Sequence, residues 1–83
     1  MKIRYFAWVR ERTGIDEETV DVPASVENAS DLMAWLSRRG ENFAAAFEEP
    51  DIIRVAYDQM HVTHDAHLDA VTEVAFFPPM TGG

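Results

Sequence analysis

Residues 73–79 read Glu-Val-Ala-Phe-Phe-Pro-Pro, a run of β-branched and aromatic side chains that two prolines bring to an end. Such residues favour strands, and proline lacks the N–H that a ladder needs, so we predict a strand that stops at Pro78. Residues 52–57, further back in the chain, also alternate with period two, and a turn at Asp58 leads into residues 60–63. The second half of the chain is therefore predicted to be largely extended.

The N-terminal stretch, residues 2–10, alternates in the same way and predicts a first strand. One face of this strand collects the side chains of Ile3, Tyr5, Ala7 and Val9. The other face turns from charged to aromatic and collects Lys2, Arg4, Phe6 and Trp8. A glycine-containing turn at residues 13–16 leads to a second strand over residues 18–22, which Pro23 ends. The two strands are predicted to form a hairpin.

Apolar residues recur at helical spacing after Pro23 and predict one main helix, with Val26, Ala29, Leu32, Met33 and Leu36 on its inner side. We place its N-cap at Ser25 and its C-cap at Gly40. A second helical piece is predicted over residues 42–48, and Pro50 stops it.

The order strand, strand, helix and further strands predicts an α+β fold, with one main helix packed across a mixed sheet. Residues 1–83 form a single domain in this interpretation, and residues 78–83 form its extended C-terminal tail. In a β-grasp arrangement the first and last strands are neighbours, although periodicity alone leaves that pairing open.

The composition excludes several kinds of chemistry. The 83 residues contain no cysteine, which excludes disulfides, thiolate zinc sites, iron–sulfur clusters and a cysteine nucleophile. Fifteen acidic residues against seven lysines and arginines give a net charge of −8, so the chain has no basic footprint for nucleic acid or an anionic membrane. We expect neutral or basic proteins as partners. The N-terminal stretch meets Arg10 too early for a signal-peptide core or a membrane span, so we expect a cytoplasmic protein.

The C-terminal residues Met80-Thr81-Gly82-Gly83 suggest a reactive tail. Six residues from Pro78 reach about 19 Å when extended. Glycines lack a Cβ, so Gly82 and Gly83 can enter a channel too narrow for side chains. The terminal carboxylate is ionised at neutral pH and is a poor electrophile. It becomes reactive only when another enzyme activates it, for example as an acyl-adenylate. The alternative is an ordinary frayed terminus.

Other candidate sites carry weaker signals. His61, His64 and His67 are spaced by three, but they lie in a predicted strand and loop, where His61 and His64 face opposite ways. We therefore favour solvated histidines over a metal site. The carboxylates Glu48, Glu49 and Asp51 have no apolar surroundings and are interpreted as a solvated face. Without a phosphate loop or a nucleophile elbow, the chain is poorly equipped as a free-standing enzyme.

The aromatic residues form a candidate interface. If Tyr5 and Phe76 face the helix, then Phe6, Trp8, Ala75 and Phe77 face away from it, next to the tail. A contiguous exposed aromatic patch usually marks an interface. The alternative is that residues 41–51 fold over this face. We favour the interface, because the patch and the tail would then emerge on the same side.

Two segments of the chain resemble a known family. Residues 2–11, followed by Gly14, and residues 73–83 resemble the MoaD-type sulfur carriers, the small subunits of molybdopterin synthase. The similarity covers essentially the whole chain. It implies a ubiquitin-like β-grasp fold, with no permanently bound cofactor. It also implies that a MoeB-like adenylyltransferase uses ATP to adenylate Gly83, which is then converted to a thiocarboxylate.

The resemblance further implies a heterotetramer with a MoaE-like large subunit. The tail would enter the large subunit's active site, and the thiocarboxylate would donate sulfur there to cyclic pyranopterin monophosphate. In this interpretation Gly83 bears the sulfur, Gly82 gives threading room, and the acid–base groups belong to the partner. Phe6 and Phe77 occupy family interface positions, and we assign to the same interface Trp8, Pro78, Met80 and Thr81.

The chain departs from the family pattern at two places. Ala70-Val71-Thr72 replaces a common Asp-Gly-Asp turn, and His61 stands where family members often have an apolar interface residue. The contact at His61 is therefore expected to be weaker or pH-sensitive. Three alternatives are a carrier for thiamin or tRNA thiolation, a ubiquitin-like protein modifier, and a β-grasp interaction module with an inert tail.

Overall fold

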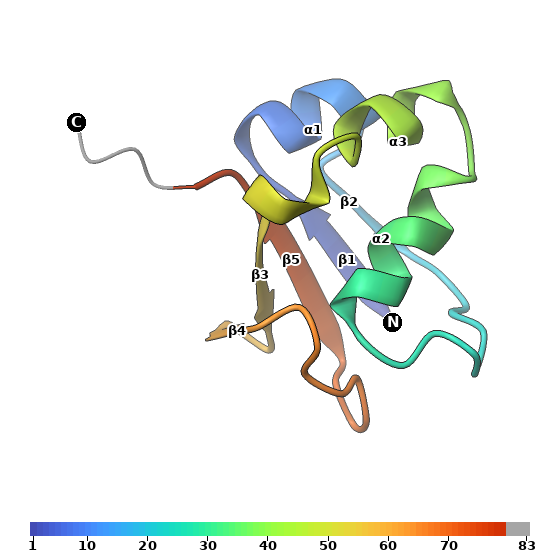
Figure 1. The fold of residues 1–83 in the computed structure, drawn as a ribbon, viewed down its shortest axis with the longest axis vertical. Coiled ribbons are helices and arrows are strands. Elements are labelled where there is room, and N and C mark those ends of the chain that lie inside the picture. The colour runs from blue at the N-terminus through green and yellow to red at the C-terminus, as the bar shows by residue number, and fades with distance from the viewer. Residues whose placement is uncertain (80–83) are drawn as a thin grey trace.

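The computed structural model describes residues 1–79 and contains one five-stranded mixed sheet. Its strand order is β2-β1-β5-β3-β4, and the strands are β1 (Lys2–Tyr5), β2 (Glu17–Thr19), β3 (Arg54–Tyr57), β4 (Met60–Val62) and β5 (Glu73–Phe77). β1 and β5 pair in parallel at the centre, and the other pairings are antiparallel. The predicted neighbourhood of the first and last strands is confirmed (Figure 1).

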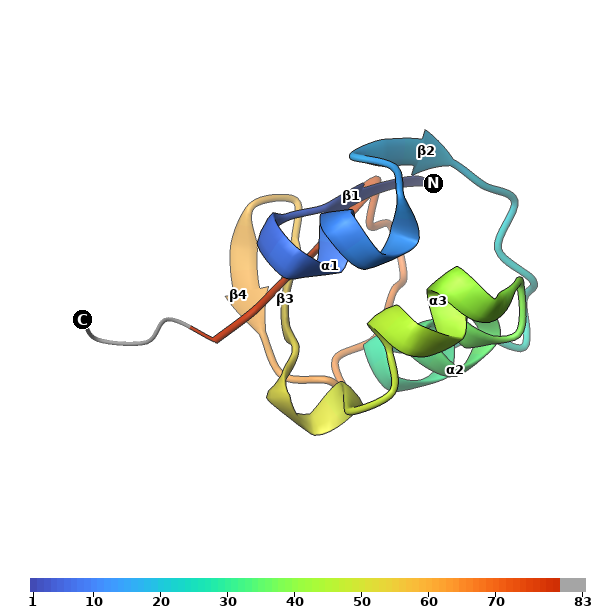
Figure 2. The same cartoon turned by 90° about the horizontal axis from the view of Figure 1, so that it is seen from above.

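Helices cover one side of the sheet. They are α1 (Ala7–Thr13), α2 (Ala29–Ser37), α3 (Glu41–Ala46) and a single 3₁₀ turn, η1 (Pro50–Ile52). Figure 2 shows α2 and α3 together on the same side of the strands, with α1 beside α3. The main predicted helix and the shorter helical piece after it are confirmed as α2 and α3.

The core lies between the sheet and these helices. Alternate strand residues, Ile3 and Tyr5 on β1 and Val74 and Phe76 on β5, are almost completely buried. They meet the apolar side of α2 and the aromatic residues of α3 and its C-cap, and the cluster includes Leu32, Met33, Leu36, Ala46 and Phe47. Close packing of this kind makes each of these side chains sensitive to truncation.

The predicted first strand over residues 2–10 is wrong in its second half. β1 ends at Tyr5, Phe6 is the extended N-cap of α1, and its carbonyl accepts hydrogen bonds from the N–H groups of Val9 and Arg10. Val9 and Thr13, four residues apart, are buried. This is helical spacing. Val9 satisfies both periods, which is why alternation alone extended the strand too far.

The predicted hairpin is wrong as a connection but correct as a pairing. β1 and β2 are antiparallel neighbours, yet α1 lies between them instead of a short turn. Gly14 has a φ of +84° and ends α1 in the left-handed conformation, where its N–H donates to the carbonyl of Arg10. Glycine adopts this conformation without a steric cost, so the residue read as a turn is a helix cap.

The predicted caps of the main helix are also wrong. Asn28, not Ser25, is the N-cap of α2, because its side-chain oxygen accepts a hydrogen bond from the N–H of Asp31 at 2.8 Å. The carboxylate of Asp31 accepts in return from the N–H of Glu27 at 3.1 Å. Asn28 therefore satisfies an orphan donor of the first turn, and Asp31 holds the residue that precedes the cap. At the other end α2 stops at Arg38, and Gly40 is the N-cap of α3.

Candidate docking face and C-terminal tail

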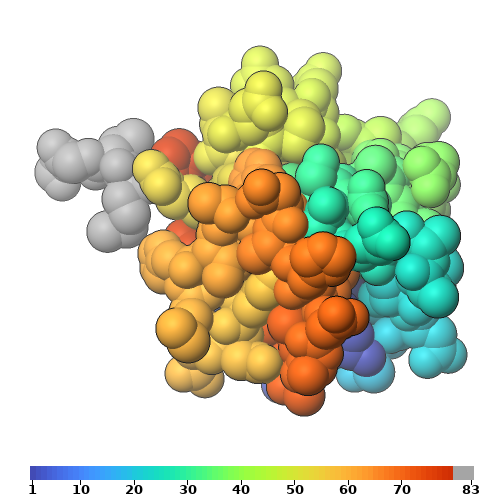
Figure 3. Space-filling model, turned by 60° about the horizontal axis from the view of Figure 1, so that its bottom comes forward, coloured from blue at the N-terminus to red at the C-terminus, as the bar shows by residue number. Residues whose placement is uncertain are grey.

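The C-terminal segment leaves the sheet at the end of β5. Phe77 is the last residue of that strand, and Pro78 and Pro79 continue it as half-buried residues without helical or strand structure. In Figure 3 the red atoms of this segment emerge beside the yellow and orange atoms of η1 and the β3–β4 region. The predicted site residues Met80, Thr81, Gly82 and Gly83 lie outside the described residues.

The side of the sheet opposite the helices is not covered by any described element. We call it the open face and define it by Arg4, Phe6, Arg54, Ala56, His61, Ala75 and Phe77. The strand register places four of these residues in one row across the sheet, because Arg4 pairs with Ala75, Ala75 with Ala56, and Ala56 with His61. Phe77 pairs with Arg54 in the next row, toward the tail.

Two aromatic rings lie in the row next to the tail. Phe6 follows β1, and its N–H donates to the carbonyl of Phe76 at 3.1 Å, so Phe6 continues the strand alongside Phe77. The guanidinium carbon of Arg4 lies 5.0 Å from the centre of the Phe6 ring. A guanidinium over a ring at this distance is attracted to it by about 0.5–1 kcal/mol. The structure therefore brings together two of the predicted interface residues, Phe6 and Phe77.

Trp8 does not join this face. It lies on α1, packs against the core cluster and carries the guanidinium of Arg12 at 4.4 Å from its ring centre. The prediction that Trp8 lies beside Phe77 on the sheet is wrong, because the chain turns into a helix at Ala7 and rotates the tryptophan off the strand direction.

Residues 41–51 do not cover the open face. Phe43 and Phe47, the N-terminal and C-terminal aromatic residues of this segment, contact Tyr5 on the helical side of the sheet, with ring centres 6.2 and 6.3 Å apart. The alternative in which this segment hides the aromatic patch is therefore wrong. Half-buried Phe6 and Phe77 are left accessible from the side opposite the helices.

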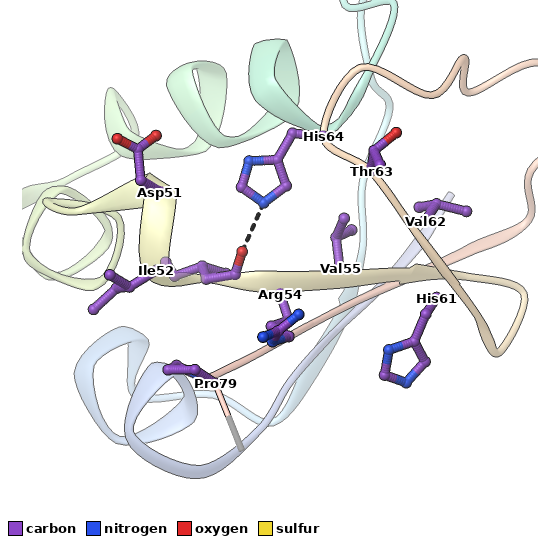
Figure 4. Close-up of a pocket in the computed structure, with 10 residues that line it drawn as sticks. Asp51, Ile52, Arg54, Val55, His61, Val62, Thr63, His64 and Pro79 are labelled. Atoms are coloured by element: carbon purple, nitrogen blue, oxygen red, sulfur yellow. Dashed lines mark hydrogen bonds between the residues drawn. The ribbon is translucent and has the colours of Figure 1, made fainter. Parts of the chain in front are cut away.

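The three histidines occupy separate environments. His61 lies on the open face, whereas a ring nitrogen of His64 contacts the carbonyl oxygen of Ile53 at 2.6 Å on the other side of β3 (Figure 4). His67 lies in a loop whose backbone forms a bridge with Asn28. Within residues 1–79 no cluster of three or more histidine, aspartate or glutamate side chains has the arrangement of a metal site.

Shifted pKa values mark structural contacts. Burial and a hydrogen bond to Glu18 raise the pKa of Tyr5 far above its usual range. Burial of Glu18 opposes its ionisation, but hydrogen bonds from Arg39 and Tyr5 outweigh this and lower the pKa of the carboxyl group. Arg39 donates to both carboxylate oxygens at 2.7 and 2.9 Å. This network ties β1 and β2 to the end of α2 and has no access to the open face.

A hollow lies next to the tail exit. Its lining runs along η1, β3 and β4 and includes Arg54, His61, His64 and Pro79. Figure 4 shows Arg54, His61 and Pro79 on one side of β3, with Asp51 and His64 on the other. The exposed Asp51 also lines this hollow, from the same side of β3 as His64.

None of the helices within residues 1–79 is long and apolar enough to cross a lipid bilayer.

The sequence and the fold of this chain resemble those of known proteins. Residues 3–83 match the ThiS family. The chain is 35% identical to the molybdopterin synthase sulfur carrier subunit of Escherichia coli strain K12, over 100% of this chain and 99% of that protein. Two solved structures are similar. A putative molybdopterin converting factor subunit 1 from Pyrococcus furiosus has a TM-score of 0.73 and 28% identity, with 95% of each chain covered.

The second structure is SAMP1 from Haloferax volcanii, with a TM-score of 0.72 and 25% identity, covering 100% of this chain and 98% of that one. The matches include both halves of the sheet, the helices between them and the C-terminal segment. The resemblance seen in the sequence is thus confirmed by full-length relatives. The chain belongs to the ThiS family and has the ubiquitin-like β-grasp fold of the MoaD-type sulfur carriers.

Proposed function

We propose that this protein is the sulfur carrier subunit of a molybdopterin synthase. The observation that carries the proposal is the full-length match to a sulfur carrier subunit of that enzyme, together with a family match that extends through residue 83. The position of the open face supports it, because Phe6 and Phe77 lie beside the point where the chain leaves β5. A protein that delivers its own terminus needs a docking surface at that point.

The chemistry takes place on the carboxylate of Gly83. A MoeB-like adenylyltransferase joins this carboxylate to the α-phosphorus of ATP and releases pyrophosphate. A donor that supplies sulfur at the oxidation level of sulfide then displaces AMP from the acyl carbon, which leaves a thiocarboxylate. ATP supplies the free energy of this activation. Activation is required because an ionised carboxylate does not react with a nucleophile by itself.

Sulfur transfer takes place in the large subunit. The open face docks on a MoaE-like partner in a heterotetramer, and Pro78, Pro79, Met80 and Thr81 lead the tail to its active site. Gly82 and Gly83 supply a backbone without side chains, which passes where a Cβ would not. The acceptor carbon of cyclic pyranopterin monophosphate gains a bond to sulfur and loses a bond to oxygen, and water then hydrolyses the bond between sulfur and the acyl carbon and returns the carboxylate. Two carriers, each loaded with one sulfur as a thiocarboxylate, supply the two sulfurs of the dithiolene. The reaction takes place in the cytoplasm.

Intact-mass measurement tests the proposal in two stages. The protein is first incubated with a cognate adenylyltransferase, ATP and a sulfur donor, and replacement of one oxygen by sulfur is expected at Gly83. The thiocarboxylated protein is then mixed with the large subunit and the pterin precursor, and formation of molybdopterin is expected. A chain that lacks Gly83 is the matched control for both stages.

The two stages separate the alternatives. Absence of sulfur in the first stage contradicts every carrier function. Sulfur in the first stage without pterin conversion in the second leaves a carrier for thiamin or tRNA thiolation. A modifier is recognised instead by isopeptide bonds between Gly83 and lysines of other proteins.

A further inference from the structure

The charges on the open face differ in sign from the charge of the whole chain. The chain carries a net charge of −8, but the part of the open face next to the tail carries the cationic side chains of Arg4 and Arg54, beside His61. Arg54 and His61 are exposed and Arg4 is half-buried. Among the described residues, neither arginine has a carboxylate within ion-pair distance.

The nearest acidic residues of the sheet do not neutralise these arginines. Glu17 lies opposite Arg4 on β2, but its carboxylate binds the ammonium group of Lys2 at 3.0 Å. Glu73 pairs with Lys2 at the far end of β5, two residues before Ala75. The guanidinium of Arg4 instead leans over Phe6, toward the tail. This side of the sheet therefore has a basic end at the tail, and a far end where Lys2, Glu17 and Glu73 carry charges of both signs.

The centre of the open face is apolar and low. Ala56 and Ala75 lie side by side between Arg4 and His61, and Phe77 stands next to them. With neighbouring strands about 4.8 Å apart, the row from Arg4 to His61 spans about 14 Å. An apolar centre with charged groups at its edge is the usual anatomy of a protein interface. Arginine and aromatic residues are also the side chains that most often dominate binding energy.

We propose that the open face binds a protein surface that carries carboxylates opposite Arg4 and Arg54. The identity of that partner as the synthase large subunit rests on the proposed function. Charges at the edge of an interface mainly set the association rate and the choice of partner. The basic end thus selects an acidic partner, although the net charge of the chain alone favours neutral or basic ones. Nucleic acid is disfavoured because its phosphates are repelled by the remaining charge of the chain.

Charge reversal tests this proposal. Arg54→Glu and Arg4→Glu are compared with Arg38→Glu, which changes the net charge equally but lies at the end of α2, on the helical side of the sheet. Affinity for the cognate large subunit is measured at about 0.1 M and about 1 M salt, between which the Debye length falls from about 10 to about 3 Å. Thermal melting of each variant verifies its fold, and Arg54→Gln serves if a reversal unfolds the chain.

The expected result is about tenfold weaker binding for each open-face reversal at low salt, a smaller loss at high salt, and binding within about twofold of wild type for Arg38→Glu. Equal binding by wild type and both open-face variants overturns the inference and leaves the proposed function intact, because the complex still forms. Failure of the wild type both to bind and to convert the precursor overturns the proposed function and, with it, the partner. Binding of a fluorescent single-stranded oligonucleotide that Arg54→Glu abolishes overturns the choice of a protein partner.

Discussion

The ring of His61 stands edge-on to the ring of Phe77, with their centres 5.1 Å apart and their planes at 67°. The two residues come from β4 and β5, which are not neighbours in the sheet, because β3 separates them. The small side chain of Ala56, which pairs with His61 on β3, leaves room for this contact. An imidazole ring thus lies directly against an aromatic residue of the proposed docking face.

The ring of His61 is expected to contribute to docking through its contact with Phe77. Its open-face neighbours on β3 and β5 are Arg54, Ala56, Ala75 and Phe77, of which Arg54 carries a charge. His61→Ala removes the edge-on contact with the Phe77 ring, and affinity for the large subunit is expected to fall about threefold. An affinity equal to that of wild type would contradict a role of His61 in docking.

Removal of Gly83 is expected to separate function from folding. Phe76 is the last residue along the chain that belongs to the described core. Deletion of Gly83 therefore leaves every described core contact in place. Sulfur loading, measured by intact mass, is expected to disappear, while the melting temperature stays within about 1 °C of wild type. Marked destabilisation by the deletion would show that the terminus is part of the folded core.

Phe76 and Phe77 are expected to have opposite roles, although they are adjacent. Phe76 is completely buried and packs against Phe47 with ring centres 5.1 Å apart, so Phe76→Ala is expected to cost about 3–5 kcal/mol. Phe77 is half-buried on the open face, and Phe77→Ala is expected to cost about 1 kcal/mol. Affinity for the large subunit is expected to fall at least about tenfold in Phe77→Ala. Wild-type affinity in that variant would exclude Phe77 as an anchor.

Asp58 is expected to stabilise the fold only above acidic pH. Its carboxylate accepts hydrogen bonds from the Thr72 hydroxyl at 2.6 Å and from the N–H of Glu73 at 2.9 Å. The hydroxyl bond is the largest cause of a lowered pKa in the folded state. The stabilisation is therefore complete above the unfolded pKa, near 3.9, and is lost as pH falls through the lower folded value.

The variant Asp58→Asn tests this pH dependence. Asn suits the positive φ of 46° at this turn and keeps one acceptor oxygen, but it has no charge to lose. The difference in melting temperature between wild type and Asp58→Asn is expected to be largest near neutral pH and to shrink below about pH 4. A difference that stays constant over this range would mean that ionisation of Asp58 does not stabilise the fold.

Glu18 is expected to stabilise the fold by accepting a hydrogen bond from the hydroxyl of buried Tyr5. Tyr5 is 1% exposed, and its hydroxyl donates to Glu18 at 2.7 Å. Glu18→Ala leaves this hydroxyl without its acceptor, and we expect a loss of about 1–2 kcal/mol in chemical denaturation. Tyr5→Phe combined with Glu18→Ala is expected to lose less than the sum of the two single changes. Full additivity would indicate that the hydrogen bond has no energetic role.

The sequence predicted those parts of the fold where one periodicity stands alone. Alternation over residues 73–77 ends at two prolines, and β5 has those bounds. The helical spacing through Leu32 and Leu36 likewise identified α2. It failed at residues 6–13, where Val9 fits both a strand that continues from Tyr5 and a helix that continues to Thr13. Packing of α1 on α3 decides between the two, and that contact joins residues about thirty positions apart.

The sequence by itself determined the α+β class, the main helix and the last strand, because each of these depends on neighbouring residues. Only the tertiary structure decided which side chains share the docking face. The strand order β1, β5, β3 and β4 places Arg4, Arg54 and His61 on one face of the sheet. Trp8 does not lie on this face, because the chain turns into α1. The net charge of −8 is a sum over the chain, whereas a partner meets the local charge of one face, which sheet register and the Lys2–Glu17 pair make basic near the tail.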